Sequence, residues 1–187
     1  MLVQTWELRP NQEWYVFAEA DTYLFWSNIV MWIRNYGSHE ETPYVGSVAS
    51  ISGYPFAHGG SGYIVSGKML KVLVEGDPEL ENKADQWANE VCCGDFLVAK
   101  AFGEVGVKVK SMGSMMNGDT VTDVPYGPGH FCEPVLSFHH VPPEQVNQLW
   151  QFEQSREKTV NSPASFPLHS MPYSFFPSLC FRGAFNC

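Results

Sequence analysis

The sequence predicts an α/β fold, in which helices cover a sheet whose strands are buried. A run of apolar residues over 14–18 has the length of a strand buried on both faces. Apolar residues at helical spacing recur elsewhere, as in the segment 143–154. Of the 187 residues, 44% are hydrophobic and 17% are charged, which is the composition of a globular chain able to bury a core.

The elements can be placed from the residues at their boundaries. The strand over residues 14–18 is followed by a predicted helix over residues 28–36, which Ser27 would cap and Gly37 would end. Dense glycine and proline then predict a loop. The remaining elements are expected in this order: a loop over 38–62, helices over 67–74, 78–90 and 94–102, a strand over 107–109, a loop over 112–130, a strand over 135–139 and a helix over 143–154.

Charge and composition exclude some classes of function. The formal net charge is -9, from 11 basic and 20 acidic residues, and Lys and Arg form no cluster, which argues against a nucleic-acid partner. No stretch of about 18 apolar residues occurs, so the sequence predicts no membrane span within this chain. The five cysteines lack zinc-finger spacing, and their odd number leaves at least one without a partner in the chain.

Two carboxylates, Glu19 and Asp21, follow the first predicted strand almost directly. Buried carboxylates are costly unless a cation balances them, and a divalent metal held against a phosphate is one such cation. Ligands of open α/β sheets also bind just beyond the carboxyl ends of strands. The same two residues could instead be ordinary surface acids near the start of a helix, where the helix dipole favours them.

Three further candidates lie later in the chain. His139 and His140 follow a short predicted strand, in which successive side chains point to opposite faces, so only one of the two is expected to join a given site. One histidine with two carboxylates suits manganese or, less typically, magnesium. Asp95 is either a helix cap or a base that takes a proton from a sugar hydroxyl.

The segment 56–63, with the sequence FAHGGSGY, is rich in glycine. Glycine lets a backbone approach a ligand closely, although many glycine-rich segments are ordinary loops. The segment lacks both the Gly-Lys-Ser/Thr ending of a nucleotide phosphate loop and the glycine spacing of a dinucleotide-binding turn. Taken alone, it is a weak indication of a ligand site.

Five blocks occur in an order that resembles one family. They are 14–28 (WYVFAEADTYLFWSN), 56–66 (FAHGGSGYIVS), 93–95 (CGD), 137–141 (SFHHV) and 149–153 (LWQFE). The chain resembles the Fringe-like β-1,3-glycosyltransferases of family 31, most of all their fungal members, and these are related to the core-1 β-1,3-galactosyltransferases. The resemblance spans roughly residues 6–153.

The resemblance implies a GT-A fold, which is a Rossmann-like α/β arrangement of helices around a mixed, mostly parallel sheet. It implies that residues 1–155 form the C-terminal portion of a glycosyltransferase catalytic domain. Residues 156–187, in which Pro, Ser and Phe are frequent, are then expected to be an irregular or disordered tail.

The resemblance also assigns roles to residues. Glu19, Asp21 and His139 would hold Mn²⁺, or another divalent cation, on the diphosphate of a UDP-sugar donor. Asp95 would be the general base for the acceptor hydroxyl. The donor sugar and the acceptor would be lined by six residues of the glycine-rich segment: His58, Gly59, Gly60, Ser61, Gly62 and Tyr63.

The expected function is therefore metal-dependent, inverting transfer of a hexose from a UDP-sugar to the 3-hydroxyl of a glycan or glycoprotein acceptor. The resemblance implies a Golgi or secretory-pathway setting as a type II membrane protein, although this chain carries no anchor or signal. Because Glu19 lies so near residue 1, the N-terminal part of the catalytic domain is expected to be missing. Activity of the truncated chain is then in question, and a non-catalytic remnant that binds a glycan or a protein is the alternative. A metal-dependent hydrolase has little support, because no typical hydrolase metal motif is present.

Overall fold

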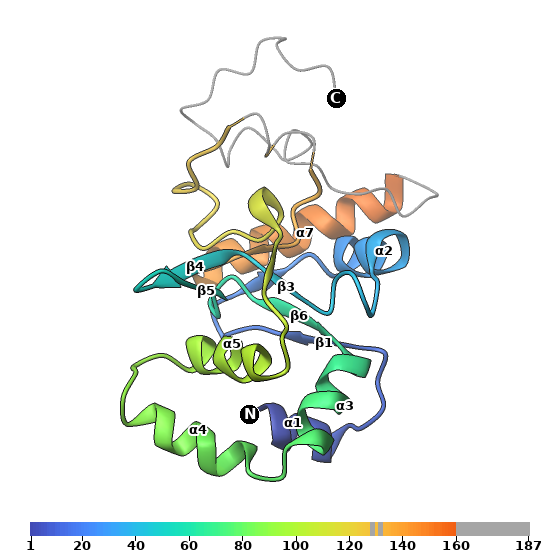
Figure 1. Cartoon of the computed structure of the whole chain (residues 1–187). Coiled ribbons are helices and arrows are strands. Elements are labelled where there is room, and N and C mark those ends of the chain that lie inside the picture. The colour runs from blue at the N-terminus through green and yellow to red at the C-terminus, as the bar shows by residue number, and fades with distance from the viewer. Residues whose placement is uncertain (128–129, 131–132, 160–187) are drawn as a thin grey trace.

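A computed structural model describes residues 1–127, 130 and 133–159 as a mixed α/β structure (Figure 1). The α/β prediction is confirmed at this level. The last helix, α7 (Pro143–Thr159), extends through the beginning of the predicted tail. The rest of that tail, residues 160–187, lies outside the described residues.

The main sheet has four strands in the order β1, β6, β3, β7. β1 and β3 both pair antiparallel with β6, and only the pair of β3 and β7 is parallel. The prediction of a mostly parallel sheet is therefore wrong for the described strands. Three helices intervene between β3 and β7, whereas β3 and β6 have no crossover helix between them, and parallel pairing requires such a crossover. The strands are β1 (Trp14–Phe17), β3 (Tyr44–Gly46), β6 (Tyr63–Ser66) and β7 (Lys110–Ser111).

Helices cover both faces of this sheet (Figure 1). On β6, Tyr63 and Val65 belong to the core on one face and Ile64 to the core on the other, as the two-residue period of a strand requires. The first face packs against α1, α3, α4 and α5, and the second against α2. The helices on the first face are α1 (Leu2–Leu8), α3 (Gly67–Gly76), α4 (Leu80–Ala88) and α5 (Gly94–Glu104), and the other is α2 (Trp26–Tyr36).

Helix starts differ in detail from the predictions. α2 begins at Trp26, so Ser27 lies inside the helix and does not cap it. α5 has Cys93 at its N-cap position, which places Asp95 in the first turn. α3 is capped by Ser66, whose hydroxyl accepts the Met69 N–H at 3.3 Å.

Short strands are the elements that the sequence prediction missed. The segment 38–62, predicted as loop, contains β3 and a hairpin whose two-residue turn, Ser52 and Gly53, has positive φ at both positions. The strand predicted over 107–109 instead lies at β7, and the one over 135–139 is reduced to two residues, the first of which, Ser137, forms a bridge to Met116. The remaining elements are β2 (Tyr23–Leu24), β4 (Val48–Ile51), β5 (Tyr54–Ala57), the 3-10 helix η1 (Gly113–Met115) and β8 (Ser137–Phe138).

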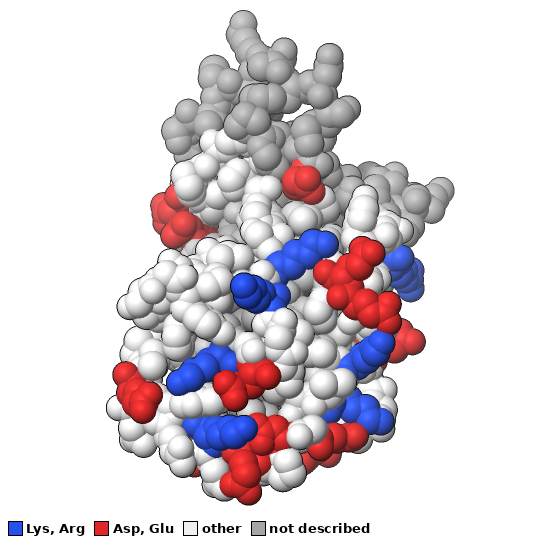
Figure 2. Space-filling view, in the orientation of Figure 1, with Lys and Arg blue, Asp and Glu red and all other residues white. Residues whose placement is uncertain are grey.

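Charges and helix lengths add two observations. Acidic and basic side chains are interspersed on the face in Figure 2. Lys83 and Asp77 form one surface ion pair, with 2.6 Å between Nζ and Oδ2. In the described part of the chain, no helix combines the length and the apolar character that crossing a bilayer requires.

Candidate metal centre and adjoining pocket

The two predicted acids lie in a tight loop after β1. Thr22 organises this loop, because its hydroxyl accepts the Glu19 N–H at 3.1 Å and donates to the Gly60 carbonyl at 2.8 Å. The Asp21 carbonyl accepts the Val141 N–H at 2.9 Å, which ties the loop to the segment after β8. These bonds bring together three segments that lie far apart in the sequence.

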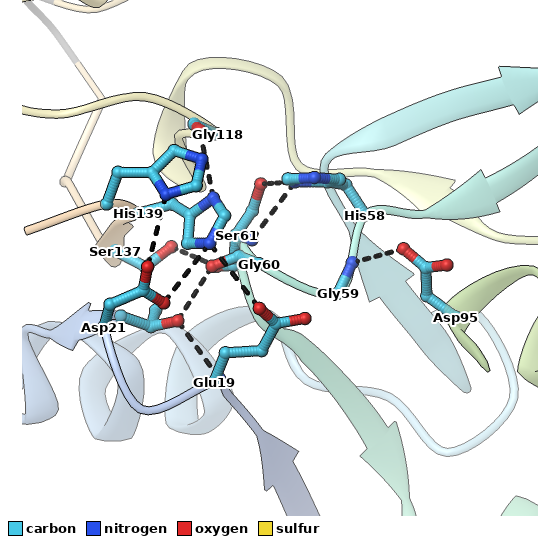
Figure 3. A network of polar contacts seen from close by, with 12 residues as sticks. Glu19, Asp21, His58, Gly59, Gly60, Ser61, Asp95, Gly118, Ser137 and His139 are labelled. Atoms are coloured by element: carbon cyan, nitrogen blue, oxygen red, sulfur yellow. Dashed lines mark hydrogen bonds and ion pairs between the residues drawn. The ribbon is translucent and has the colours of Figure 1, made fainter. Parts of the chain in front are cut away.

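His139 is buried beside these acids, with only 5% of its surface exposed (Figure 3). Its Nδ1 lies 3.2 Å from the Gly118 carbonyl, which can only accept, so Nδ1 carries the proton. Its Nε2 lies 3.3 Å from Asp21 Oδ1 and 3.6 Å from Glu19 Oε2. A neutral ring would therefore turn a lone pair toward two carboxylates, which is unfavourable unless a proton or a metal cation lies there.

His140 also joins the cluster, which corrects the prediction that it would point away. Both histidines lie beyond the end of β8, so strand alternation does not apply to them. His140 has a φ of 52°, and its ring stacks on His139 with 3.7 Å between the ring centroids. Its Nδ1 lies 3.2 Å from Asp21 Oδ2. One ligand atom each from Asp21, His139 and His140 lie within 4.8 Å of one another.

The histidines favour the ionised form of Asp21. Its partial desolvation raises the pKa, but the hydrogen bond from His140 and the charge of His139 outweigh that effect and hold the pKa of Asp21 below its usual value. A carboxylate with two imidazoles is a nitrogen and oxygen ligand set that suits a first-row divalent cation. Glu19 lies at the margin of the set, because its side chain is 59% exposed and has its closest approach to His139 at 3.6 Å.

Glycine is required beside His139. A Cβ on Gly60 would lie 2.1 Å from Cε1 of the His139 ring, so any larger residue would displace the ring. The neighbouring Ser61 carbonyl accepts the Ser137 hydroxyl at 2.5 Å, which fastens the glycine-rich loop to β8. The loop therefore shapes the candidate metal centre directly, in addition to bordering the pocket described next.

A pocket of about 480 Å³ adjoins the cluster. Glu19, Gly59 and Asp95 are among the residues that line it. A Cβ on Gly59 would lie 3.2 Å from Glu19 Oε1 and 3.4 Å from Asp95 Oδ2, so both acids lie beside this glycine. The other lining residues are Met1, Phe17, Ala18, Phe56, His58, Tyr63, Cys93 and Gly94.

Asp95 is held toward the pocket by two backbone groups. Its Oδ2 accepts the Gly59 N–H at 2.8 Å (Figure 3), and its Oδ1 accepts the Phe96 N–H at 2.8 Å. Asp95 thus lies beside the glycine-rich loop and apart from the cluster of Asp21, His139 and His140. Its carboxylate can accept a proton from a group bound in the pocket.

Two polar side chains of the glycine-rich loop face this region. His58 Nδ1 accepts the Ser61 N–H at 3.2 Å and lies 2.8 Å from the Ser61 hydroxyl, which leaves Nε2 as the protonated nitrogen of a neutral ring. Tyr63 is 3% exposed, and its hydroxyl has no hydrogen-bond partner within the described residues. Burial raises the pKa of Tyr63, and the nearby Tyr44 and Asp95 add to the effect, so the phenol remains a donor.

The sequence prediction missed three contributors to the site: Thr22, Gly118 and His140. Only His140 left a signal, in the His-His doublet, and its left-handed backbone was not predictable from that pattern. A separate and larger pocket, of about 870 Å³, lies between α2 and β7, and none of the predicted site residues line it.

Comparison with known proteins returned no match, either to a family model or to a curated protein sequence.

Proposed function

We propose that this chain is a metal-dependent transferase domain that moves a hexose from a UDP-sugar to the 3-hydroxyl of a glycan or glycoprotein acceptor. The observation that carries the proposal is the placement of a cluster of Asp21, His139 and His140 next to a pocket that has Asp95 on its wall. A cation site beside an organised base is what transfer from a nucleotide diphosphate to a hydroxyl needs.

The ligand atoms fit a divalent cation. His139 directs the nitrogen that is not bonded to Gly118 at two carboxylates, a geometry that calls for positive charge between them. Asp21, His139 and His140 would hold the cation, with Glu19 as an outer partner, and Mn²⁺ suits this mixed set better than Mg²⁺. Bound there, it would neutralise the developing charge of a diphosphate leaving group.

Asp95 is the base in this proposal. The Gly59 N–H fixes the orientation of its Oδ2, and the carboxylate would take the proton of the acceptor hydroxyl as that oxygen attacks the anomeric carbon. Transfer would invert the anomeric carbon and yield a β-1,3 linkage. Phe17 and Tyr63, stacked with 4.9 Å between ring centroids, give the pocket an aromatic wall against which a sugar ring can pack.

Calorimetric titration of the full chain with Mn²⁺, in the presence and absence of UDP, tests the cation site. We expect Asp21→Asn to weaken Mn²⁺ binding by about tenfold to a hundredfold, since it removes a charged ligand while keeping the side-chain shape. Asp85→Asn is the matched control, because Asp85 is an exposed aspartate on α4, and it should bind Mn²⁺ as the unmodified chain does. Equal affinity in the Asp21 and Asp85 variants would refute the metal site.

Release of UDP from UDP-sugars, measured with a panel of hydroxyl acceptors, tests the chemistry. Asp95→Asn should keep Mn²⁺ and UDP binding but lower the transfer rate by about a hundredfold or more, as expected when a general base is removed. Wild-type transfer by that variant would rule out Asp95 as the base. Binding of a glycan without metal, together with no UDP release in any combination, would support the non-catalytic alternative instead.

A further inference from the structure

A disulfide joins two adjacent residues, Cys92 and Cys93, directly before α5. Cys92 is exposed, and Cys93 occupies the N-cap position of α5 and lines the pocket together with Gly94 and Asp95. The bond therefore lies at the rim of the pocket, two residues from the carboxylate that faces into it.

Global stability does not account for a disulfide of this kind. A cross-link stabilises a fold mainly by closing a loop in the unfolded chain, and adjacent cysteines close the smallest loop there is. Its constraint acts on the local backbone, at the start of the helix whose first turn contains Asp95. The Asp95 carboxylate in turn accepts the Gly59 N–H at 2.8 Å, so the constrained segment is coupled to the glycine-rich loop.

We propose that the disulfide of Cys92 and Cys93 is a reducible clasp on this pocket, a bond whose reduction releases the local backbone. A dithiol reductant passes two electrons and two protons to the bond, which breaks to give two thiols while the reductant becomes a disulfide. Because Cys92 is an exposed residue, it offers a route for thiolate attack. Reduction frees the backbone before α5 and loosens the hydrogen bond of Asp95 with Gly59. Any effect on sugar transfer rests on the proposed function, whereas the clasp itself is testable without activity.

The experiment uses the full chain with Cys132, Cys180 and Cys187 replaced by serine, so that only the pair of interest can react. Mass spectrometry after treatment with an alkylating reagent counts free thiols. We expect no label before reduction and two labels after a dithiol has been added. Labelling of Cys92 and Cys93 in the untreated, oxidised protein would overturn the proposal.

Amide hydrogen exchange at Gly59, followed by NMR, reports the coupled hydrogen bond. Reduction should speed exchange at Gly59 by about tenfold, while the amides of α2 keep their rates, because only a local contact is lost. Unchanged exchange at Gly59 in the reduced protein would show that the disulfide does not hold Asp95 in place.

Two variants test whether the exchange response at Gly59 depends on the disulfide and on Asp95. Cys92→Ser combined with Cys93→Ser should exchange quickly at Gly59 with or without the dithiol, because the clasp is absent. Asp95→Ala should also exchange quickly in both redox states, because the acceptor is gone. A continued response to the dithiol in either variant would contradict the proposed coupling. None of these readouts depends on UDP or on a metal, so a failure of the transferase proposal would leave them interpretable.

Discussion

At the scale of single residues, His139 is the most constrained side chain of the candidate site. The Gly118 carbonyl accepts from one ring nitrogen, the His140 ring stacks on it, and Gly60 lies against its edge. These contacts fix the direction of Nε2 before any ligand arrives, which lowers the entropic cost of binding a cation.

Gly60→Ala tests that constraint. The added methyl group would lie 2.1 Å from His139 Cε1, so the ring must shift. We expect a loss of about 1–3 kcal/mol in the free energy of unfolding, as in other overpacked sites, and weaker Mn²⁺ binding by calorimetry. Gly76→Ala is the control, because a Cβ at Gly76 meets nothing within 4 Å and the variant should keep both properties. Full Mn²⁺ affinity in the Gly60 variant would show that the ring position is unimportant.

Local sequence patterns pointed to part of the candidate site. Carboxylates directly after a buried strand made Glu19 and Asp21 candidates, whereas the choice of His139 over its neighbour came from the family resemblance. His140 was not predictable, because its direction depends on a left-handed backbone conformation that the residue type does not impose. Thr22 and Gly118 support the site through hydrogen bonds to residues that are distant in the sequence, and no local sequence pattern encodes such contacts.

At the scale of elements, α7 is tied to the loop that carries the acids. The Tyr23 hydroxyl donates to the Glu153 carboxylate, and both residues are buried. Burial raises the pKa of Tyr23 and the Glu153 carboxylate raises it further, so the phenol remains protonated and a donor. Tyr23 starts β2, two residues after Asp21, so this bond links the helix to the candidate metal centre.

Tyr23→Phe removes that bond without changing the ring. The buried Glu153 carboxylate then loses a donor, and we expect the free energy of unfolding in urea to fall by about 1–2 kcal/mol. Tyr36→Phe, at an exposed position on α2, should leave stability unchanged. An unfolding midpoint in the Tyr23 variant equal to that of the control would mean that the bond contributes nothing.

The hairpin of β4 and β5 allows a separate test. Gly53 in its turn has a φ of 81° with open space around it, so Gly53→Ala strains only the backbone. We expect a loss of about 1–2 kcal/mol from the left-handed conformation. Mn²⁺ binding should be unchanged, since the turn lies at the end of the hairpin away from His58. Weakened metal binding would show that the conformation of the hairpin affects the Mn²⁺ affinity of the candidate site.

Elements with a strong internal period were predictable, and very short strands were not. The strand at 14–17 and the helices α3, α4 and α5 appear where apolar spacing and boundary residues place them. β2, β7 and β8 have two residues each, too few to show a period, and they form because a distant partner supplies the hydrogen bonds. The same absence of a local signal hid the antiparallel pairing of the main sheet.

At the scale of the whole molecule, a ligand that binds only the folded state must stabilise it. The cluster joins segments separated by up to 119 residues, so the unfolded chain presents no equivalent site. At Mn²⁺ concentrations about a hundredfold above the dissociation constant, we expect the free energy of unfolding to rise by about 2.7 kcal/mol. Thermal unfolding with and without Mn²⁺ measures this, and Asp21→Asn should abolish most of the increase. A rise of equal size in that variant would place the cation elsewhere.

The contact between Asp21 and His140 has a consequence for the connectivity of the chain. It joins residues 119 positions apart in the sequence, so the backbone between them leaves the candidate site and returns to it. Cleavage of this backbone segment at one peptide bond, for instance at the turn of Ser52 and Gly53, would give two fragments that are still in contact at the candidate site. A cation bound there would hold the two fragments together, so the fraction of assembled fragments would depend on the metal concentration.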